Sequence, residues 1–528
     1  MPAANRKILI LCVLISVLAF IAFAFPNTKG TRDVQMLSVF EPDEYAQYPV
    51  VQRMLSPKPT LRQTIIGFLA YDYYYYGFPF FGSSALVILP LKWLGLAENT
   101  QLTMLVLRQL VSVLPMLLAF LLLIKMWDGF QTWRSPVGLI ILLAIPAVTQ
   151  NALWWHPDGL VLLLTVLVLW FLNKDQFQLK HNFFLAAFFC GVLTALKLIG
   201  FHFFLAVAYC LWVALRENKK TWTEIIKAGM LFILIMALSF VIANPFVLSS
   251  WGRIAWLQIF HYQRALLDQG YGIVYQKGIF ATYPWLREAY GHAIFLLSVL
   301  AINIWAAIQS KQKHLYRLIL AWSLPMTVMT FFFTHFKFQY WLPVGILLIS
   351  GIIGVLPLQK PLKSTNLKDI LIILSASIIL LQMAFFVPQN IKTLQAAFHR
   401  EKTSPELAFF DHVEDKLAPI SERDLTIYFD YRLYLPRKEN WQIHTNFEML
   451  TYNYIQQNGF DVLLLLRQRI NDYLKPNAVG IDPAKFVESQ AFYQAARDGK
   501  IEGYQLLYED ETGLIFIRTE LENQYNGN

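Results

Sequence analysis

Long apolar runs alternate with short polar segments along most of the chain. The first run, residues 8–25, follows Arg6 and Lys7 and has no small-residue cleavage pattern before Pro26, which favours an uncleaved membrane span over a signal peptide. Ten more runs have the length and apolarity of membrane-spanning helices. They cover residues 104–124, 136–150, 158–173, 183–199, 201–215, 228–246, 291–308, 318–333, 341–357 and 369–387. The pattern predicts an all-α polytopic membrane bundle of about eleven transmembrane helices.

Basic residues gather in alternate connections between these runs. Lys and Arg are frequent in the connections near residues 125–134, 174–180, 216–227, 311–317 and 360–368, and they are sparse in the others. This bias predicts that the basic connections and the N-terminus lie in the cytoplasm, and an odd number of spans then sends the C-terminal region outward. The turn at Gly200 is very short. If that hairpin does not span, two helices are lost and the orientation of the rest is unchanged.

Three regions face outward in this topology, namely residues 26–103, 247–290 and 388–528. The last has ordinary charge content and β-like runs at Leu425–Phe429 and Val462–Leu466, and YQLLYEDETGLIFIR predicts a hairpin that turns at Asp510–Gly513. We therefore divide the chain into a membrane domain, residues 1–387 with the outward loops 26–103 and 247–290, and a small extracytoplasmic α/β domain, residues 388–528. The tyrosine run Tyr73–Tyr76 is typical of an interfacial aromatic belt.

Composition supports the membrane assignment. The chain has 528 residues, of which 56% are hydrophobic and only 15% charged. The net charge of +9 comes from short clusters between apolar runs, which argues against a nucleic-acid-binding surface. The cysteines Cys12, Cys190 and Cys210 all lie in apolar stretches, where cysteine behaves as a small hydrophobic residue.

The first outward loop carries the strongest candidate for chemistry. In FEPDEYAQYPVVQRML, Glu41, Asp43 and Glu44 place three carboxylates within four residues. Mutual repulsion should raise at least one of their pKa values, which suits a group that takes up a proton. A helix N-terminus, which favours acidic residues, explains the same pattern equally well. The segment that follows is expected to be a short amphipathic helix.

A second candidate is WWHPDG at residues 154–159, where His156 and Asp158 flank a proline at the outward end of a predicted span. Ionisable residues at the membrane boundary generally have a partner or a function. The alternative is a simple helix start with interfacial tryptophans. Metal ligation by His156 and Asp158 would need more ligands than this spacing offers, so the sequence neither indicates nor excludes a divalent metal, and it predicts no cofactor.

Lysines and histidines form the remaining candidates. Lys197 lies in the apolar segment ALKLIGFHF, with His202 close behind, and His335 and Lys337 lie in FFFTHFKFQYWLP at the outward entrance to a span. An unpaired ammonium in the bilayer costs about 2.5–3.5 kcal/mol, so Lys197 should face a partner, a watery cavity or an anionic ligand. Snorkelling of Lys197 to the headgroups and simple interface anchoring by Lys337 are the alternatives. Acids and bases from four helix ends thus converge on the outer face.

These segments resemble the GT-C superfamily of membrane glycosyltransferases, particularly the branch of protein O-mannosyltransferases and aminoarabinose-lipid A transferases. The resemblance covers most of residues 8–357. Its ordered motifs are the acidic pair Asp43 and Glu44, the aromatic stretch YYYYGFPFFGSSALVILPLKWLG leading to Arg108, HPDG, Lys197 with Gly200, ANPF at residues 243–246, and QYWLP. The chain differs from the family in having QYWLP where Arg-Tyr is common, and a single Pro79 where two prolines are usual.

The resemblance implies an inverting glycosyltransferase that moves a sugar from a polyprenyl-phosphate-linked donor to a lipid, glycan or protein acceptor at the outer side of the membrane. It assigns the general base to Asp43, with Glu44 beside it. From the positions of the charges, we expect His156 and Asp158 to position the substrate and Lys197, His202, His335 and Lys337 to bind the donor phosphate. The expected location is a bacterial inner membrane, among its lipids and without a nucleic-acid partner.

The main alternative is a polytopic transporter or flippase of a lipid-linked or anionic substrate. Such proteins usually show matching broken helices in two halves and charges near the midplane. This chain has its charges at one face and a large outer region. A structure in which Asp43, Asp158 and Lys197 line one outward cavity would favour the transferase.

Overall fold

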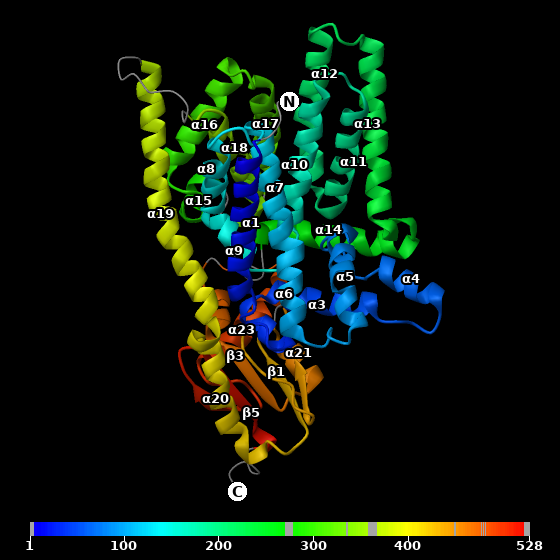
Figure 1. The fold of residues 1–528 in the computed structure, drawn as a ribbon. Coiled ribbons are helices and arrows are strands. Elements are labelled where there is room, and N and C mark those ends of the chain that lie inside the picture. The colour runs from blue at the N-terminus through cyan, green and yellow to red at the C-terminus, as the bar shows by residue number, and fades with distance from the viewer. Residues whose placement is uncertain are drawn as a thin grey trace.

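The computed structural model describes residues 5–269, 278–333, 336–356, 367–447, 450–476, 478, 480 and 482–521. Figure 1 shows a tall helical bundle above a smaller domain that contains a β-sheet, with the helices of the outward loops between them. The start of α1 (Arg6–Asn27) lies at the end of the bundle away from the sheet (Figure 1).

Within the described residues, the apolar runs predicted from the sequence fall on helices of the bundle. They are α1, α6 (Thr100–Leu107), η1 (Arg108–Val113), α7 (Leu114–Trp127), α8 (Arg134–Leu143), α9 (Pro146–Ala152), α10 (Asp158–Asp175), α11 (His181–Leu196), η2 (Leu198–Phe203), α12 (Phe204–Arg216), α13 (Trp222–Ala243), α16 (Ala293–Gln309), α17 (Lys313–Val328), η4 (Met329–Phe333), α18 (Phe338–Ser350), η5 (Gly351–Gly354) and α19 (Leu367–Thr403).

Within the described residues, five helices are long and apolar enough to cross a membrane alone, and up to seven spans result if each of two bent pairs counts as one. The bent pairs are α8 with α9, at 67°, and α15 with α16, at 83°. Three shorter apolar helices, including α11 and α18, lie among them. The all-α bundle is therefore confirmed, whereas the count of about eleven spans stays a prediction.

The outward loops are built from helices rather than irregular chain. The first contains α2 (Val34–Phe40), α3 (Pro42–Leu55), α4 (Leu61–Leu69) and α5 (Phe78–Trp93), and the second contains η3 (Pro245–Leu248), α14 (Ser250–Gln269) and α15 (Ile279–Tyr290). Pro42 occupies the first helical position of α3, where its missing N–H costs nothing. Asp43 and Glu44 follow in the first turn, where the helix dipole favours carboxylates.

The C-terminal region forms the predicted small α/β domain. Its elements are α20 (Pro405–Leu417), η6 (Ala418–Ile420), β1 (Leu425–Phe429), β2 (Trp441–His444), α21 (Tyr452–Asn458), β3 (Val462–Leu466), α22 (Arg467–Tyr473), α23 (Pro483–Arg497), β4 (Tyr504–Glu509) and β5 (Gly513–Arg518). The strand order is β2-β1-β3-β5-β4, with β1 parallel to β2 and β3 and with β5 antiparallel to β3 and β4. Alternate side chains of β1 and β3 enter two hydrophobic clusters on opposite faces.

Helix α19 connects the bundle to this domain and contacts the first loop. It runs beyond the predicted domain boundary, which falls at Pro388 inside the helix. Near its C-terminal end, Arg400 pairs with Glu41 at 3.3 Å, and Glu401 accepts a hydrogen bond from the Gly30 backbone at 2.6 Å. The division into domains at residue 388 stays a prediction, but these polar contacts hold the C-terminal end of α19 against the first loop.

Candidate active site

A buried ion pair fixes the start of α3. Arg108 donates from Nε to Oε1 of Glu44 at 2.9 Å and from Nη2 to Oε2 at 2.6 Å, and both side chains are fully buried. The backbone N–H of Trp155 donates to the same carboxylate at 2.5 Å. Glu44 thus joins three segments that are far apart in sequence: the first loop, the π-helical segment η1 and the WWHPDG stretch. Both of its carboxylate oxygens are engaged.

The adjacent carboxylate has the opposite environment. Asp43 is exposed, and within the part of the chain that the structure describes it makes no ion pair or hydrogen bond. It lines a cavity together with Lys337. A carboxylate with open lone pairs that lines a cavity is placed to accept a proton from a bound ligand.

Glu41 is the third member of the acidic group. Burial raises its pKa from 4.5 to about 7, and repulsion by Glu44 adds to this effect, while Arg400 opposes it. The sequence predicted a raised pKa within the acidic group. That prediction is confirmed at Glu41, and burial rather than repulsion is the larger cause.

The WWHPDG stretch carries a buried chain of polar groups. His156 Nδ1 contacts Asp158 Oδ2, and the hydroxyl of Tyr76 lies 2.6 Å from His156 Nε2. Lys197 Nζ donates to the other oxygen of Asp158 at 2.6 Å. The hydroxyl of Ser112 donates to the His156 carbonyl at 3.1 Å and accepts from its N–H at 3.0 Å, which fixes the stretch against η1. His156 and Asp158 are therefore brought together with Lys197.

Lys197 follows the last residue of α11 and has a partner, as its burial requires. Its ammonium group lies over the rings of Tyr76 and Tyr340, at 5.6 and 5.2 Å from their centroids. Lys337 lies over the same Tyr340 ring at 5.9 Å. Two cations from separate helix ends thus lie near one aromatic ring.

The ANPF motif explains how Tyr76 and Lys197 meet. Asn244 donates to the Ala195 carbonyl at 3.0 Å and accepts from the Phe78 N–H at 2.9 Å. Gly77 donates to the Leu196 carbonyl at 3.1 Å, and a Cβ on it would lie 1.8 Å from the Ala195 oxygen. Only glycine allows the two backbones to approach this closely.

The predicted histidines do not join this arrangement. His202 is partly buried, with Nδ1 3.1 Å from the Ile199 carbonyl and its ring edge-on to Trp322, and it is not among the residues that line the cavity. His335 lies outside the described residues.

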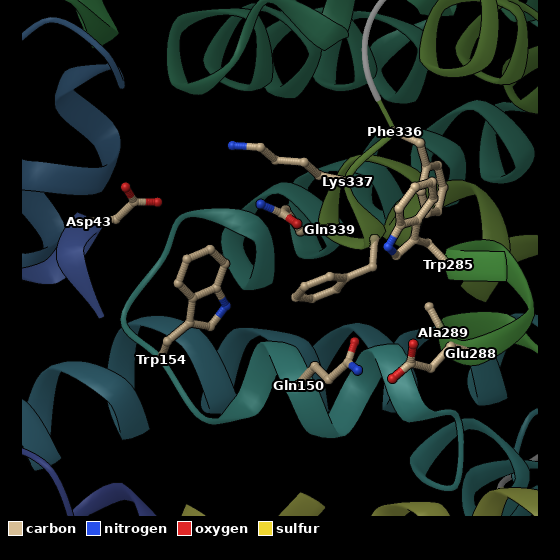
Figure 2. Close-up of a pocket in the computed structure, with 10 residues that line it drawn as sticks. Asp43, Gln150, Trp154, Trp285, Glu288, Ala289, Phe336, Lys337 and Gln339 are labelled. Carbon is tan, nitrogen blue, oxygen red and sulfur yellow. The ribbon is translucent and has the colours of Figure 1, made fainter. Parts of the chain in front are cut away.

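The cavity has a volume of about 350 Å³. It is lined by Asp43, Gln150, Trp154, Trp285, Glu288, Ala289, Phe336, Lys337, Phe338 and Gln339. Figure 2 shows Asp43 at one end, Trp285 and Glu288 at the other, and Lys337 and Trp154 on opposite sides between them. The ring of Trp154 stacks on His156 at 4.1 Å, so the buried polar chain lies directly behind the cavity wall.

Several residues of the site escaped the sequence analysis. The tyrosine run is not an interfacial belt at Tyr74 and Tyr76, because Tyr74 is buried against Phe246 and Tyr76 bonds to His156. Gln150 is uncharged and lies in a predicted apolar span, so nothing in the sequence marked it as a site residue. The only sequence feature that pointed to Tyr340 was its place in the QYWLP motif. Among the described residues, no group of three or more potential metal ligands comes together.

Comparisons with known proteins find a matching family and solved structures of similar fold. The sequence profile of Glycosyltransferase family 87 matches residues 79–334. No curated protein matches the chain in sequence. The crystal structure of ArnT from Cupriavidus metallidurans bound to undecaprenyl phosphate is similar with a TM-score of 0.52 at 11% identity, covering 97% of this chain and 98% of that one. Its apo state gives a TM-score of 0.50 at 11% identity, over 96% and 97% of the two chains.

The matched profile agrees with the resemblance to membrane glycosyltransferases, and the shared fold confirms the helical bundle with a small sheet domain at its C-terminus. Nothing in these comparisons supports the transporter alternative.

Proposed function

We propose that this chain, an integral membrane glycosyltransferase with the GT-C fold, transfers a sugar from a polyprenyl phosphate to an acceptor at the extracytoplasmic face, with inversion at the anomeric carbon. One observation carries the proposal: the open carboxylate of Asp43 and the ammonium group of Lys337 line a single cavity. A single displacement needs one base for the acceptor and positive charge for the departing phosphate.

In this mechanism Asp43 accepts the proton of the acceptor hydroxyl or amine. The acceptor atom forms a bond to the anomeric carbon while the bond from that carbon to the phosphate oxygen breaks. The leaving group is the polyprenyl phosphate, which gains one negative charge. Lys337, which lines the cavity, and Lys197, which lies near the same Tyr340 ring, offset this charge.

Glu44 is assigned a positioning role, because Arg108 and the Trp155 N–H already occupy its oxygens. Asp158 holds Lys197, and His156 connects Asp158 to Tyr76. Undecaprenyl phosphate is the ligand named for ArnT, and a long polyprenyl phosphate is the corresponding donor carrier that we propose here. His202 receives no role in this mechanism.

The activity is tested with purified protein and a panel of radiolabelled polyprenyl-phosphate sugars. Asp43→Asn should lose turnover by about 10²- to 10⁴-fold, the range expected when a general base is removed. Asp72→Asn is the matched control, because Asp72 is an exposed acid of the same loop. Its backbone φ is 57°, a conformation that asparagine also tolerates. Near-normal turnover by Asp43→Asn would remove Asp43 as the base.

We also propose that the protein lies in a bacterial inner membrane with its N-terminus cytoplasmic and the sheet domain outside. The basic connection between α12 and α13 lies at the end of the bundle away from the sheet (Figure 1), which supports this orientation. In sealed cells, an impermeant thiol reagent should label Asn458→Cys and leave Lys219→Cys unlabelled. The three native cysteines are buried and give a low background. The reverse labelling would contradict the orientation.

A further inference from the structure

Three residues that line the cavity each carry a buried polar atom without a hydrogen-bond partner in the described chain. Within the described residues, the amide Oε1 atoms of Gln150 and Gln339 and the indole Nε1 of Trp154 are buried and unbonded. All three residues line the cavity, and Figure 2 shows Gln339 across from Gln150 and Trp154. Gln339 is only 5% exposed. Since buried polar groups are nearly always hydrogen-bonded in proteins, three unbonded ones at one cavity indicate a ligand that completes them.

Flat aromatic surfaces accompany these polar atoms. The indole of Trp154 is held by its stack on His156, whose ring plane differs by 4°. Trp285 lies at the far end of the cavity beside the carboxylate of Glu288 (Figure 2). A sugar ring has apolar C–H faces and hydroxyl groups on its edge. It therefore matches a site of aromatic faces with a few hydrogen-bond acceptors and one donor.

We infer that the part of the cavity formed by Gln150, Trp154, Gln339, Trp285 and Glu288, here called the ring subsite, binds a sugar ring and selects which sugar is used. The two glutamine oxygens and Glu288 accept hydrogen bonds from ring hydroxyls, Trp154 Nε1 donates one, and Trp285 packs against the ring. This inference rests on the proposed function and adds the residues that recognise the sugar.

The position and size of the ring subsite fit this role. Asp43 and Lys337 line the same cavity, so a ring bound beside them lies next to the reacting groups. The volume of about 350 Å³ lies just above the lower limit, about 300 Å³, of typical small-molecule sites. Two sugars have the required chemistry, namely the one being transferred and one on the acceptor, and the experiment separates them.

The test uses the full chain in lipid nanodiscs. The probes are undecaprenyl phosphate without a sugar, the same lipid carrying a hexose, a pentose or an amino sugar, and the methyl glycosides of these sugars. The variants are Gln339→Met and Gln150→Met. The control is Gln109→Met, because Gln109 is also a buried amide without partners but does not line the cavity.

If the sugar of the donor occupies the ring subsite, one sugar-loaded lipid should bind more tightly than the bare lipid. Each glutamine variant should then weaken that binding about five- to tenfold, the loss of roughly one hydrogen bond, and leave the bare lipid unaffected. If a sugar of the acceptor occupies it instead, a methyl glycoside should stabilise the lipid-loaded protein, and the glutamine variants should lose this stabilisation. The control should match the parent in both measurements.

The inference is overturned if bare and sugar-loaded lipids bind the parent equally and no methyl glycoside stabilises it, or if the glutamine variants match the control. Failure of the bare lipid phosphate to bind the parent is a different result, because it contradicts the proposed function and not the ring subsite alone.

Discussion

The buried pair Arg108–Glu44 should hold the first outward loop in place, and breaking it should cost both stability and activity. Arg108 makes two hydrogen bonds to Glu44 and donates to the carbonyls of Asn27 and Lys29 at 3.0 and 3.3 Å. Glu44→Gln leaves this guanidinium charge buried without its carboxylate. Removing one partner of a buried pair typically destabilises a protein by about 3–5 kcal/mol.

A double-mutant cycle measures the coupling directly. Glu44→Gln, Arg108→Met and the double variant Glu44→Gln/Arg108→Met are compared by equilibrium unfolding in mixed micelles, followed by tryptophan fluorescence. The double variant leaves no unpaired charge, so its cost should fall below the sum of the two single costs by about 3 kcal/mol. Glu44→Gln should also lower kcat without weakening donor binding, because it disturbs the first turn of α3, which carries Asp43.

Arg467→Met is the matched control for a lost ion pair. Arg467 pairs with Glu509 at 3.0 Å on the surface of the sheet domain, where both side chains are substantially exposed, and its loss should cost no more than about 1 kcal/mol. Our reasoning is refuted if Glu44→Gln costs no more than this control, or if the costs of the two buried variants simply add.

Three further predictions follow from particular contacts. The pKa of Glu41 is raised from 4.5 to about 7, so between these pH values the folded chain keeps a proton that the unfolded chain releases. Stability should therefore fall as the pH rises from about 4.5 to 7. In melting curves, Glu41→Gln should abolish this fall. Lys337→Met should raise KM for the donor about tenfold or more at unchanged stability, whereas Lys197→Met should also lower the melting temperature, because it strips Asp158 of its ammonium partner; equal melting temperatures would contradict this distinction. Gly77→Ala should abolish folded protein in size-exclusion chromatography, and Gly67→Ala, whose Cβ would meet only a lysine side chain at 3.6 Å, should not.

Local patterns predicted much of the fold. The apolar runs fall on helices because the bilayer leaves a spanning segment few alternatives. Strands β1 and β3 begin and end at the predicted residues, and the hairpin turns between β4 and β5 as expected, because short β-branched and aromatic runs around a turn are strong local signals.

The division of roles within the acidic group could not be read from the sequence. Glu41, Asp43 and Glu44 are equivalent as a pattern, and their environments differ only because Arg108, 64 residues away from Glu44, binds one of them and Arg400 another. Which arginine binds which carboxylate depends on how the helices pack, and the order of the residues along the chain does not reveal it.

The uncharged residues of the cavity were hidden for another reason. Gln150 and Gln339 lie in or beside apolar helices and carry no charge that would single them out; Gln339 stood only within the QYWLP motif, and the unbonded side-chain oxygens of both residues are seen only in the folded chain. Tyr76 was hidden because a run of tyrosines is typical of an interfacial belt, and its contact with His156 forms only in the folded chain.

An experimental structure with a polyprenyl phosphate bound is the most direct test of the claim that charged groups from distant helix ends form one transfer site. We predict phosphate oxygens within about 3 Å of Lys337 Nζ, the hydrogen-bonding distance, with the sugar-bearing side of the phosphate facing Asp43. A phosphate bound away from Lys337 and Lys197, with Asp43 facing bulk solvent, would contradict the account.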